Sequence, residues 1–174
     1  MTPTRRLIRQ RMLTLSRRLG SQARVLEIGI AGDDPPGANR EFFHAAQYVT
    51  ADKNPALTPD LVLDLEGGAR DHWDVACLPF DLVICSQTLE HVWNLEAAFQ
   101  CLYGLTAWGG YCIADTPFNY PPHGTETEPD YWRLTPQALE RLATKAGFDV
   151  VEIVAPDHLL VSALLRKGQK SESV

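Results

Sequence analysis

Acidic side chains stand at or near the ends of three short apolar runs in this sequence. Glu27 lies in the run Val25–Gly32, and Asp52 and Asp64 each close a later run. Short apolar runs that end in turns are typical of buried strands in a parallel sheet. A carboxylate is costly to bury unless a polar group meets it. Because open α/β sheets bind ligands at the carboxyl ends of their strands, these acids predict a ligand site there.

The spacing between the glycine turn and Asp52 indicates what kind of ligand this is. Asp52 follows Gly29 by 23 residues. An acidic residue about 20 positions after a glycine turn accepts hydrogen bonds from ribose hydroxyls in dinucleotide-binding folds. The sequence therefore predicts a cofactor that carries a nucleoside.

Two histidines are candidate bases beside this site. His91 is expected one turn into a helix over 89–105, and His123 lies in a long loop over 116–133. Imidazole is the side chain best suited to accept a proton near neutral pH. Two other interpretations remain open, in which His91 caps a helix or satisfies the core and His123 is simply solvated.

The same loop carries a second candidate cluster, Asp130-Tyr131-Trp132-Arg133. Loops of this length in compact domains are commonly lids or binding loops. Tyr131 and Arg133 are therefore predicted to bind a polar or anionic substrate. The alternative is that Asp130 pairs with Arg133 while the two aromatic rings pack the loop on the sheet.

The elements that position these residues alternate along the chain. Helices are expected over 3–19, 38–46, 89–105 and 136–146, the last with Thr135 as N-cap and Gly147 as the stop. Strands are expected over 24–30, 48–52, 60–64, 80–85, 111–114, 150–154 and 159–165. A short turn joins the last two strands, so they should be antiparallel. The prediction is an α/β fold, a Rossmann-like seven-stranded and mostly parallel sheet with a C-terminal antiparallel hairpin and helices on both faces.

Length and charge suggest one domain of 24–166, preceded by a basic amphipathic helix within 1–23 and followed by a polar tail at 167–174. Residues 1–24 hold seven arginines and no acid, whereas the rest carries nine basic and 22 acidic side chains. So acidic a body disfavours non-specific nucleic-acid binding. The first helix could be a packed lid with a solvated arginine face, a substrate cover, a contact for an anionic partner or a membrane-surface helix.

Compartment and metal content follow from what the sequence does not contain. No run approaches the ~18 apolar residues of a membrane span, and the arginine-rich start is no signal peptide. A cytoplasmic protein is expected. The four cysteines show no CxxC spacing, so buried free thiols are predicted, and no metal site.

Over residues 24–165 the chain resembles the class I S-adenosylmethionine-dependent methyltransferases, especially the small bacterial "type 11" group. The resemblance rests on motifs in order: VLEIGIAG at 25–32, a Phe-Phe pair, YVTAD at 48–52, DLVLDLE at 60–66, Leu-Pro-Phe at 78–80, Leu-Glu-His-Val at 89–92, Gly-Gly at 109–110, and DYWRLTPQALERLATKAGF at 130–148.

The resemblance implies S-adenosylmethionine as the cofactor and assigns its contacts. The turn that contains Gly29, Ala31 and Gly32 would approach the methionine part. Asp52 would bind the ribose, and Ser86 and Gln87 would lie near the reacting centre. Asp64 and Leu65 would border the adenine, and Glu27 and Lys53 complete the predicted cofactor set.

The glycine turn departs from the usual Glu-x-Gly-x-Gly-x-Gly pattern. Ala31 replaces the second glycine and Asp33 the third. An added methyl group narrows the approach of the backbone to a ligand. This departure keeps open a methyltransferase-like domain that has lost catalysis and serves in binding or assembly, with the N-terminal helix as its contact.

The expected function is methyl transfer to a small-molecule or sugar-like acceptor, at oxygen. Enzymes that methylate amide or nucleobase amino groups carry Asn-Pro-Pro-aromatic after the fourth strand, where this chain has Ser86-Gln87-Thr88. No cysteine follows a proline, as cytosine-carbon methylation requires. A nicotinamide-dependent oxidoreductase is a further alternative. It is disfavoured because the turn lacks the glycine that lets a helix N-terminus meet a pyrophosphate.

Overall fold

A computed structural model describes residues 3–30, 38–43, 47–67, 79–126 and 128–169. Within these ranges the strands form one seven-stranded sheet in the order β3-β2-β1-β4-β5-β7-β6. The strands are β1 (Arg24–Ile28), β2 (Gln47–Asp52), β3 (Leu61–Val62), β4 (Phe80–Ser86), β5 (Thr106–Pro117), β6 (Asp149–Val154) and β7 (Leu160–Arg166). Strands β1 to β5 are parallel, and β7 is antiparallel to both β5 and β6. The predicted fold class is confirmed.

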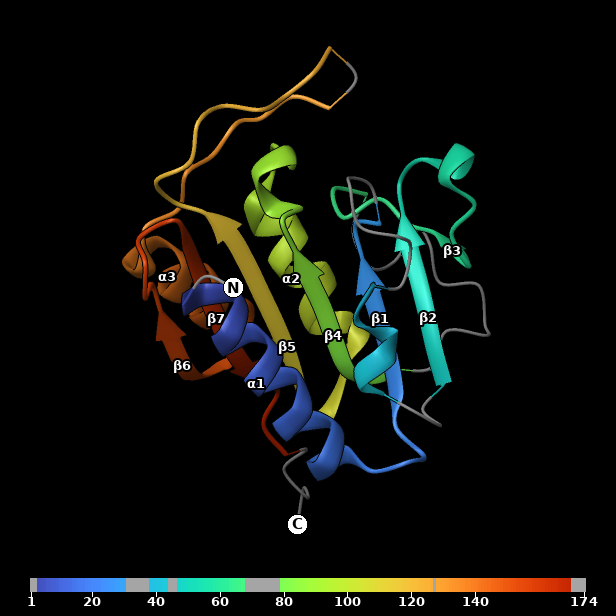
Figure 1. Ribbon diagram of the computed structural model, residues 1–174. Helices are drawn as coiled ribbons and strands as arrows, with labels where there is room; N and C mark the ends of the chain where they lie inside the picture. Colours follow the sequence, from blue (N-terminus) through green and yellow to red (C-terminus); the bar gives the residue numbers. More distant parts are fainter. Residues whose placement is uncertain (1–2, 31–37, 44–46, 68–78, 127, 170–174) are drawn as a thin grey trace.

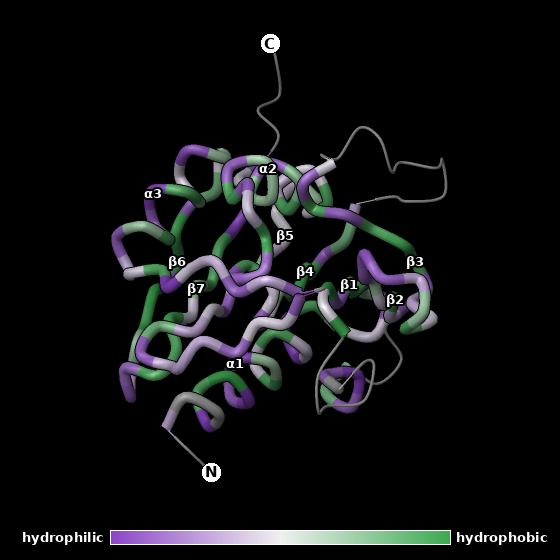
Figure 2. Tube along the Cα trace, turned by 90° about the horizontal axis from the view of Figure 1, so that it is seen from above, coloured by the Kyte–Doolittle hydropathy of each residue, from purple (hydrophilic) through white to green (hydrophobic). Residues whose placement is uncertain are grey.

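Helices cover both faces of this sheet (Figures 1 and 2). The helices are α1 (Pro3–Leu19), α2 (Leu95–Leu105), α3 (Pro136–Ala146) and the short 3₁₀ segments η1 (Ala38–Phe42), η2 (Pro55–Leu57) and η3 (Leu89–His91). Alternate residues of a strand point to opposite faces. Accordingly Leu82 and Ile84 of β4 belong to the apolar layer under α1, whereas Val83 and Cys85 belong to the layer that includes α2 and α3.

Helix α3 has the predicted boundaries because its capping residues are strong. The Thr135 hydroxyl oxygen accepts a hydrogen bond from Ala138 N, and Pro136 begins the helix. Gly147 ends it at φ 107°, a conformation that favours glycine. Leu134 and Leu139 are both buried, as a hydrophobic staple requires.

The predicted helix over 89–105 is wrong in its first turns. Asn94 is the N-cap of α2, since its side-chain oxygen accepts from Ala97 N at 3.1 Å. Residues Leu89–His91 form the separate segment η3 instead. His91 therefore belongs to η3 and precedes α2.

Two strands also differ from their predicted lengths. β5 begins at Thr106, directly after α2, and runs to Pro117. β3 is reduced to Leu61–Val62. At the start of β3 the Asp60 carboxylate accepts hydrogen bonds from Thr50 N and Thr50 Oγ1, at 2.9 and 2.8 Å, so pairing with β2 begins only at Leu61.

The amphipathic helix predicted at the N-terminus is α1, and its apolar side is buried at Met12 and Leu15. The expectation of a solvated arginine face is wrong at one position. Arg11 is only 6% exposed and donates hydrogen bonds to Ser162 Oγ and, at 2.7 Å, to Glu152 Oε2. It also lowers the otherwise raised pKa of Asp115, whose burial opposes ionisation. Arg11 thus fixes α1 to β6 and β7.

Replacing Arg11 with methionine should lower the free energy of unfolding by about 2 kcal/mol. Removing one partner of a buried ion pair costs about 3–5 kcal/mol, and half-exposed Glu152 reduces that cost. Urea denaturation followed by circular dichroism measures the change. Arg17→Met, at an exposed position of the same helix, is the control and should shift stability by less than about 0.5 kcal/mol. Equal losses in the two variants would contradict the assigned role of Arg11.

Residues Cys85, Cys101 and Cys112 are buried free thiols, as predicted, and burial raises the pKa of each. Cys77 lies outside the described residues. At the other end of the chain, buried Lys167 donates from Nζ to Tyr103 O at 2.8 Å, so the fold continues past β7. No helix in the described ranges combines the length and apolar character needed to cross a membrane.

Candidate active site

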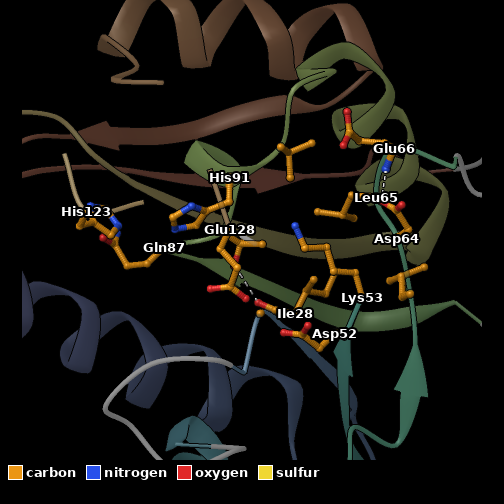
Figure 3. A pocket seen from close by; sticks show the side chains of 14 residues that line it. Ile28, Asp52, Lys53, Asp64, Leu65, Glu66, Gln87, His91, His123 and Glu128 are labelled. Carbon is orange, nitrogen blue, oxygen red and sulfur yellow. Dashed lines mark hydrogen bonds between the residues drawn. The ribbon is translucent and has the colours of Figure 1, made fainter. Parts of the chain in front are cut away.

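A cavity of about 330 Å³ lies at the carboxyl ends of β1, β2 and β4. Eight predicted site residues line it: Gly29, Asp52, Lys53, Asp64, Leu65, Gln87, His91 and His123. Asp52, Lys53 and Asp64 lie toward one end, and Gln87, His91 and His123 toward the other (Figure 3). The cavity therefore joins an acidic end to an end that carries two imidazoles.

Asp52 is held rigidly at the end of β2. Its Oδ2 accepts from Ile30 N at 3.0 Å, and its Oδ1 accepts from Asn54 N at 2.8 Å. Each carboxylate oxygen has further lone pairs for hydroxyl donors. Since Asp52 lines the cavity, its geometry suits the pair of hydroxyls of a ribose.

Gly29 lets the chain leave β1 close to η3. Its φ is +81°, and a Cβ built there would lie 2.0 Å from Thr88 Oγ1. Thr88 cannot easily withdraw, because its hydroxyl lies 3.2 Å from Ile28 O and 3.1 Å from Ser86 O. This contact sets the separation of the β1 and β4 ends that frame the cavity.

Gly29→Ala should therefore lower the free energy of unfolding by at least about 2 kcal/mol. Gly20→Ala is the matched control, since Gly20 has a similar φ of +75° but nothing within 4 Å of its built Cβ. The control should lose only the conformational cost of about 1 kcal/mol. Denaturation of both variants separates steric contact from backbone strain, and equal losses would rule out the contact.

The wall beside Asp52 is formed by the segment after β3. Leu63 and Leu65 are buried, and Asp64 Oδ1 accepts from Glu66 N at 2.9 Å. Glu66 Oε1 in turn accepts from Asn94 N at 2.8 Å, which ties this segment to the start of α2. Apolar side chains flanked by carboxylates suit a nucleobase, which has flat apolar faces and polar edges.

Glu27 and Ser86 were predicted to contact the cofactor, but neither lines the cavity. Glu27 is buried, and its two oxygens accept from Asn39 Nδ2 at 2.7 Å and from the Tyr48 hydroxyl at 2.9 Å. Ser86 Oγ donates to Asp115 Oδ2 at 3.1 Å. The polar partner expected for Glu27 is thus supplied by the protein. Ala31 and Gly32 lie outside the described residues.

Arg133 and Tyr131 do not line the cavity either. Arg133 contacts both oxygens of Asp130, at 2.5 and 2.6 Å, and donates to Tyr120 O and Pro121 O, both at 2.9 Å. The guanidinium holds the pKa of Asp130 well below its usual range. The alternative interpretation, an Asp130–Arg133 pair, is the one that the structure shows.

Tyr131 packs against Trp93, with ring centroids 5.2 Å apart, and remains 43% exposed. Its backbone N–H donates to Glu90 O at 2.7 Å. That bond fastens the long loop to η3.

Glu90 is the site residue that sequence analysis missed. Its side chain is fully buried, and neither carboxylate oxygen has a hydrogen-bond partner among the described residues. Glu90 Oε1 lies 3.9 Å from His91 Nε2 and 3.7 Å from His123 Nε2. Burial, with a smaller effect of the charge on Asp130, raises the pKa of Glu90 to about 7. The available signal was its place between Leu89 and His91, directly after β4.

The Glu90–His91–His123 cluster can bind, hold or accept a proton at the end of the cavity opposite Asp52. His91 and His123 are 32 residues apart in the sequence, and their rings pack edge to face with their centroids 5.1 Å apart. Both histidines line the cavity, and their role as bases stays a prediction. Together the fold and the cavity define an α/β protein of the nucleoside-cofactor-binding class.

Comparison with known families gives the assignment. Residues 3–153 match a family model described as a methyltransferase domain. The chain belongs to this family, and the class I methyltransferase expected from the sequence is confirmed, although the "type 11" subgroup is not. A comparison with curated protein sequences found no significant match.

Solved methyltransferases share this fold at low sequence identity. The 1,6-didemethyltoxoflavin-N1-methyltransferase of Burkholderia thailandensis, solved with S-adenosylhomocysteine, is 15% identical to this chain at a TM-score of 0.65. The matched region covers 91% of this chain and 76% of that enzyme. The N-methyltransferase NodS of Bradyrhizobium japonicum is 18% identical at 0.61, covering 97% and 98%. The CurJ carbon methyltransferase is 15% identical at 0.65, and this chain spans 49% of its length. The S-adenosylmethionine expected as cofactor agrees with the family.

Proposed function

We propose that this protein transfers a methyl group from S-adenosylmethionine to a small-molecule acceptor, at oxygen. One observation carries the proposal. In a chain of the methyltransferase family, a single cavity joins the doubly anchored Asp52 carboxylate to two imidazoles. Asp52 receives the ribose hydroxyls, and Lys53, Asp64 and Leu65 surround the base. Gln87 and Gly29 face the remainder of the cofactor.

The acceptor is activated at the Glu90–His91–His123 cluster. Methyl transfer from a sulfonium is an in-line displacement, so the protein must align the nucleophile with the methyl group and the sulfur. A hydroxyl nucleophile must also lose its proton. His91 and His123, which line the cavity, are the proposed proton acceptors. An acidic body and three buried free thiols favour a small-molecule acceptor in a reducing, cytoplasmic compartment.

Calorimetric titration with S-adenosylmethionine, S-adenosylhomocysteine and NADH tests the cofactor. Saturable binding of the first two and none of NADH is expected. Binding of NADH alone would contradict the proposal. Failure of all three to bind would favour the catalytically impaired binding domain that the altered glycine turn keeps open.

A further inference from the structure

One carboxylate and two imidazoles converge at the Glu90–His91–His123 cluster. One ligand atom of each residue can be chosen so that all three lie within 4.8 Å of one another. The Glu90 carboxylate is fully buried and unpartnered, so it faces the full cost of desolvation. A cation or a proton between these atoms would offset that cost.

The tautomers of both histidines are set by the groups behind them. His91 Nδ1 lies 2.9 Å from Pro129 O, a carbonyl that only accepts, so the proton is on Nδ1 and the lone pair on Nε2. His123 Nδ1 lies 3.2 Å from Asp130 Oδ2 and 3.4 Å from Pro121 O, which are also acceptors. In these tautomers each Nε2 carries the lone pair, and the two Nε2 atoms lie 3.9 and 3.7 Å from Glu90 Oε1.

We propose that Glu90, His91 and His123 bind a divalent transition-metal cation at the wall of the cavity. Two imidazole nitrogens and one carboxylate oxygen form a ligand set that suits Zn²⁺, Fe²⁺ or Ni²⁺ better than Mg²⁺ or Ca²⁺, which prefer oxygen alone. Histidine ligands of metals characteristically donate their other N–H to a carbonyl or carboxylate, as His91 can to Pro129 O and His123 to Pro121 O here.

The distances are close to those of a coordinated ion. Ligands at the usual 2.0–2.1 Å from Zn²⁺ in a tetrahedron stand about 3.3 Å apart. The two Glu90–histidine distances of 3.9 and 3.7 Å exceed this by a few tenths of an ångström, and the whole set lies within 4.8 Å, so binding would draw the three ligands together. His91 and His123 both line the cavity, so a fourth coordination position faces its interior.

The role of the cation in catalysis rests on the proposed function, whereas its binding does not. A bound cation lowers the pKa of a hydroxyl that reaches it. The acceptor then releases its proton to water, and its oxygen forms the new bond to the methyl carbon. The carbon–sulfur bond breaks with its electron pair on sulfur. When the cation is bound, the two imidazoles are its ligands and do not act as bases. The cation then takes their place in activating the acceptor hydroxyl.

Calorimetric titration of Zn²⁺ into the full chain, stripped with EDTA and free of a histidine tag, tests the site. One Zn²⁺ per chain is expected, and Mg²⁺ should bind far more weakly. Loss of a residue that only hydrogen-bonds a metal ligand lowers metal affinity about 10–100-fold. Glu90→Gln removes a ligand itself, so it should lower Zn²⁺ affinity by more than this. His123→Gln is the second variant, because its side chain is 35% exposed and its replacement should leave the fold intact.

The control is His158→Gln, an exposed histidine in the turn between β6 and β7, which should not change Zn²⁺ affinity. Co²⁺ in place of Zn²⁺ should give visible absorption that the two cluster variants lose. If Zn²⁺ does not bind stoichiometrically, or if neither cluster variant changes its binding, the proposal is overturned. Protons would then supply the positive charge between these side chains. S-adenosylhomocysteine binding to the stripped protein is a separate readout, so failure of the metal site and failure of the proposed function are distinguishable.

Discussion

Asp52→Asn is expected to weaken the binding of S-adenosylhomocysteine about 100-fold, or about 2.7 kcal/mol. Hydrogen bonds to a charged group contribute about 1.5–3 kcal/mol each, and the proposed ribose contact makes two of them. The amide also presents N–H to one of the backbone donors, Ile30 N or Asn54 N, that now bind the carboxylate. Calorimetry measures the loss.

Asp64→Asn is the matched control, since it changes a carboxylate to an amide in the same cavity at the end of the neighbouring β3 segment. An adenine edge accepts an amide as readily as a carboxylate, so its effect should stay below about tenfold. Equal losses in the two variants, or an unchanged affinity of Asp52→Asn, would contradict the assignment of Asp52 to the ribose. Thermal unfolding of both variants shows that they are folded.

Asp52 also shows why this half of the site could be predicted. Its position follows from two features that are local in sequence, an apolar run and the turn that ends it. The sheet order then brings the ends of β1 and β2 together, since the two strands pair in parallel from Arg24 and Gln47 onward. Where a side chain is positioned only by the end of its own strand, the periodicity of the sequence is sufficient to predict its place in the fold.

Glu90 and Arg11 could not be predicted in the same way because their partners are distant in sequence. Glu90 stands within the motif Leu89–Val92, yet its burial depends on the loop that returns at Pro129 and Tyr131. Arg11 is buried by contacts with Ser162 and Glu152, about 150 residues later. A charged residue in an amphipathic helix indicates solvent unless such a distant partner is known.

Glu27 shows how much a charged residue in an apolar run predicts by itself. The sequence correctly indicated that its carboxylate needs a polar partner, and two side chains of the protein bond it. Tyr48 and Asn39 supply that partner from within the protein, and the pKa of Tyr48 is raised by burial and by the Glu27 charge. A misplaced charge therefore predicts a buried polar contact, but its position relative to the cavity must come from the structure.

Arg133→Met should lower the free energy of unfolding by about 3 kcal/mol and expose the loop to protease. The variant loses the five hydrogen bonds that Arg133 donates and leaves Asp130, whose side chain is 3% exposed, without its counter-charge. Breaking such a pair costs about 3–5 kcal/mol, and the 24% exposure of Arg133 places the value at the lower end. Urea denaturation gives the free energy, and limited proteolysis reports on residues 118–126.

The pH dependence of this loss has a definite sign. Because the pKa of Asp130 is depressed in the folded protein, the pair stabilises fully above the ordinary aspartate pKa of about 4 and loses its contribution as the pH falls. The difference between wild type and Arg133→Met should therefore be largest near neutrality and shrink in acid. Arg141→Met, at an exposed position of α3, should differ from wild type by less than about 0.5 kcal/mol at every pH.

The double variant Asp130→Asn/Arg133→Met separates lost pairing from an abandoned buried charge. Removing both partners is commonly less costly than removing one, so the double variant should regain part of the stability lost by Arg133→Met. Because Asp130 Oδ2 also accepts from His123 N at 2.8 Å, the loop geometry that presents this imidazole depends on the pair. Zn²⁺ affinity should therefore fall in Arg133→Met although Arg133 contacts none of the three proposed ligand atoms. Unchanged Zn²⁺ affinity together with a cleaved loop would show that His123 is positioned without this pair.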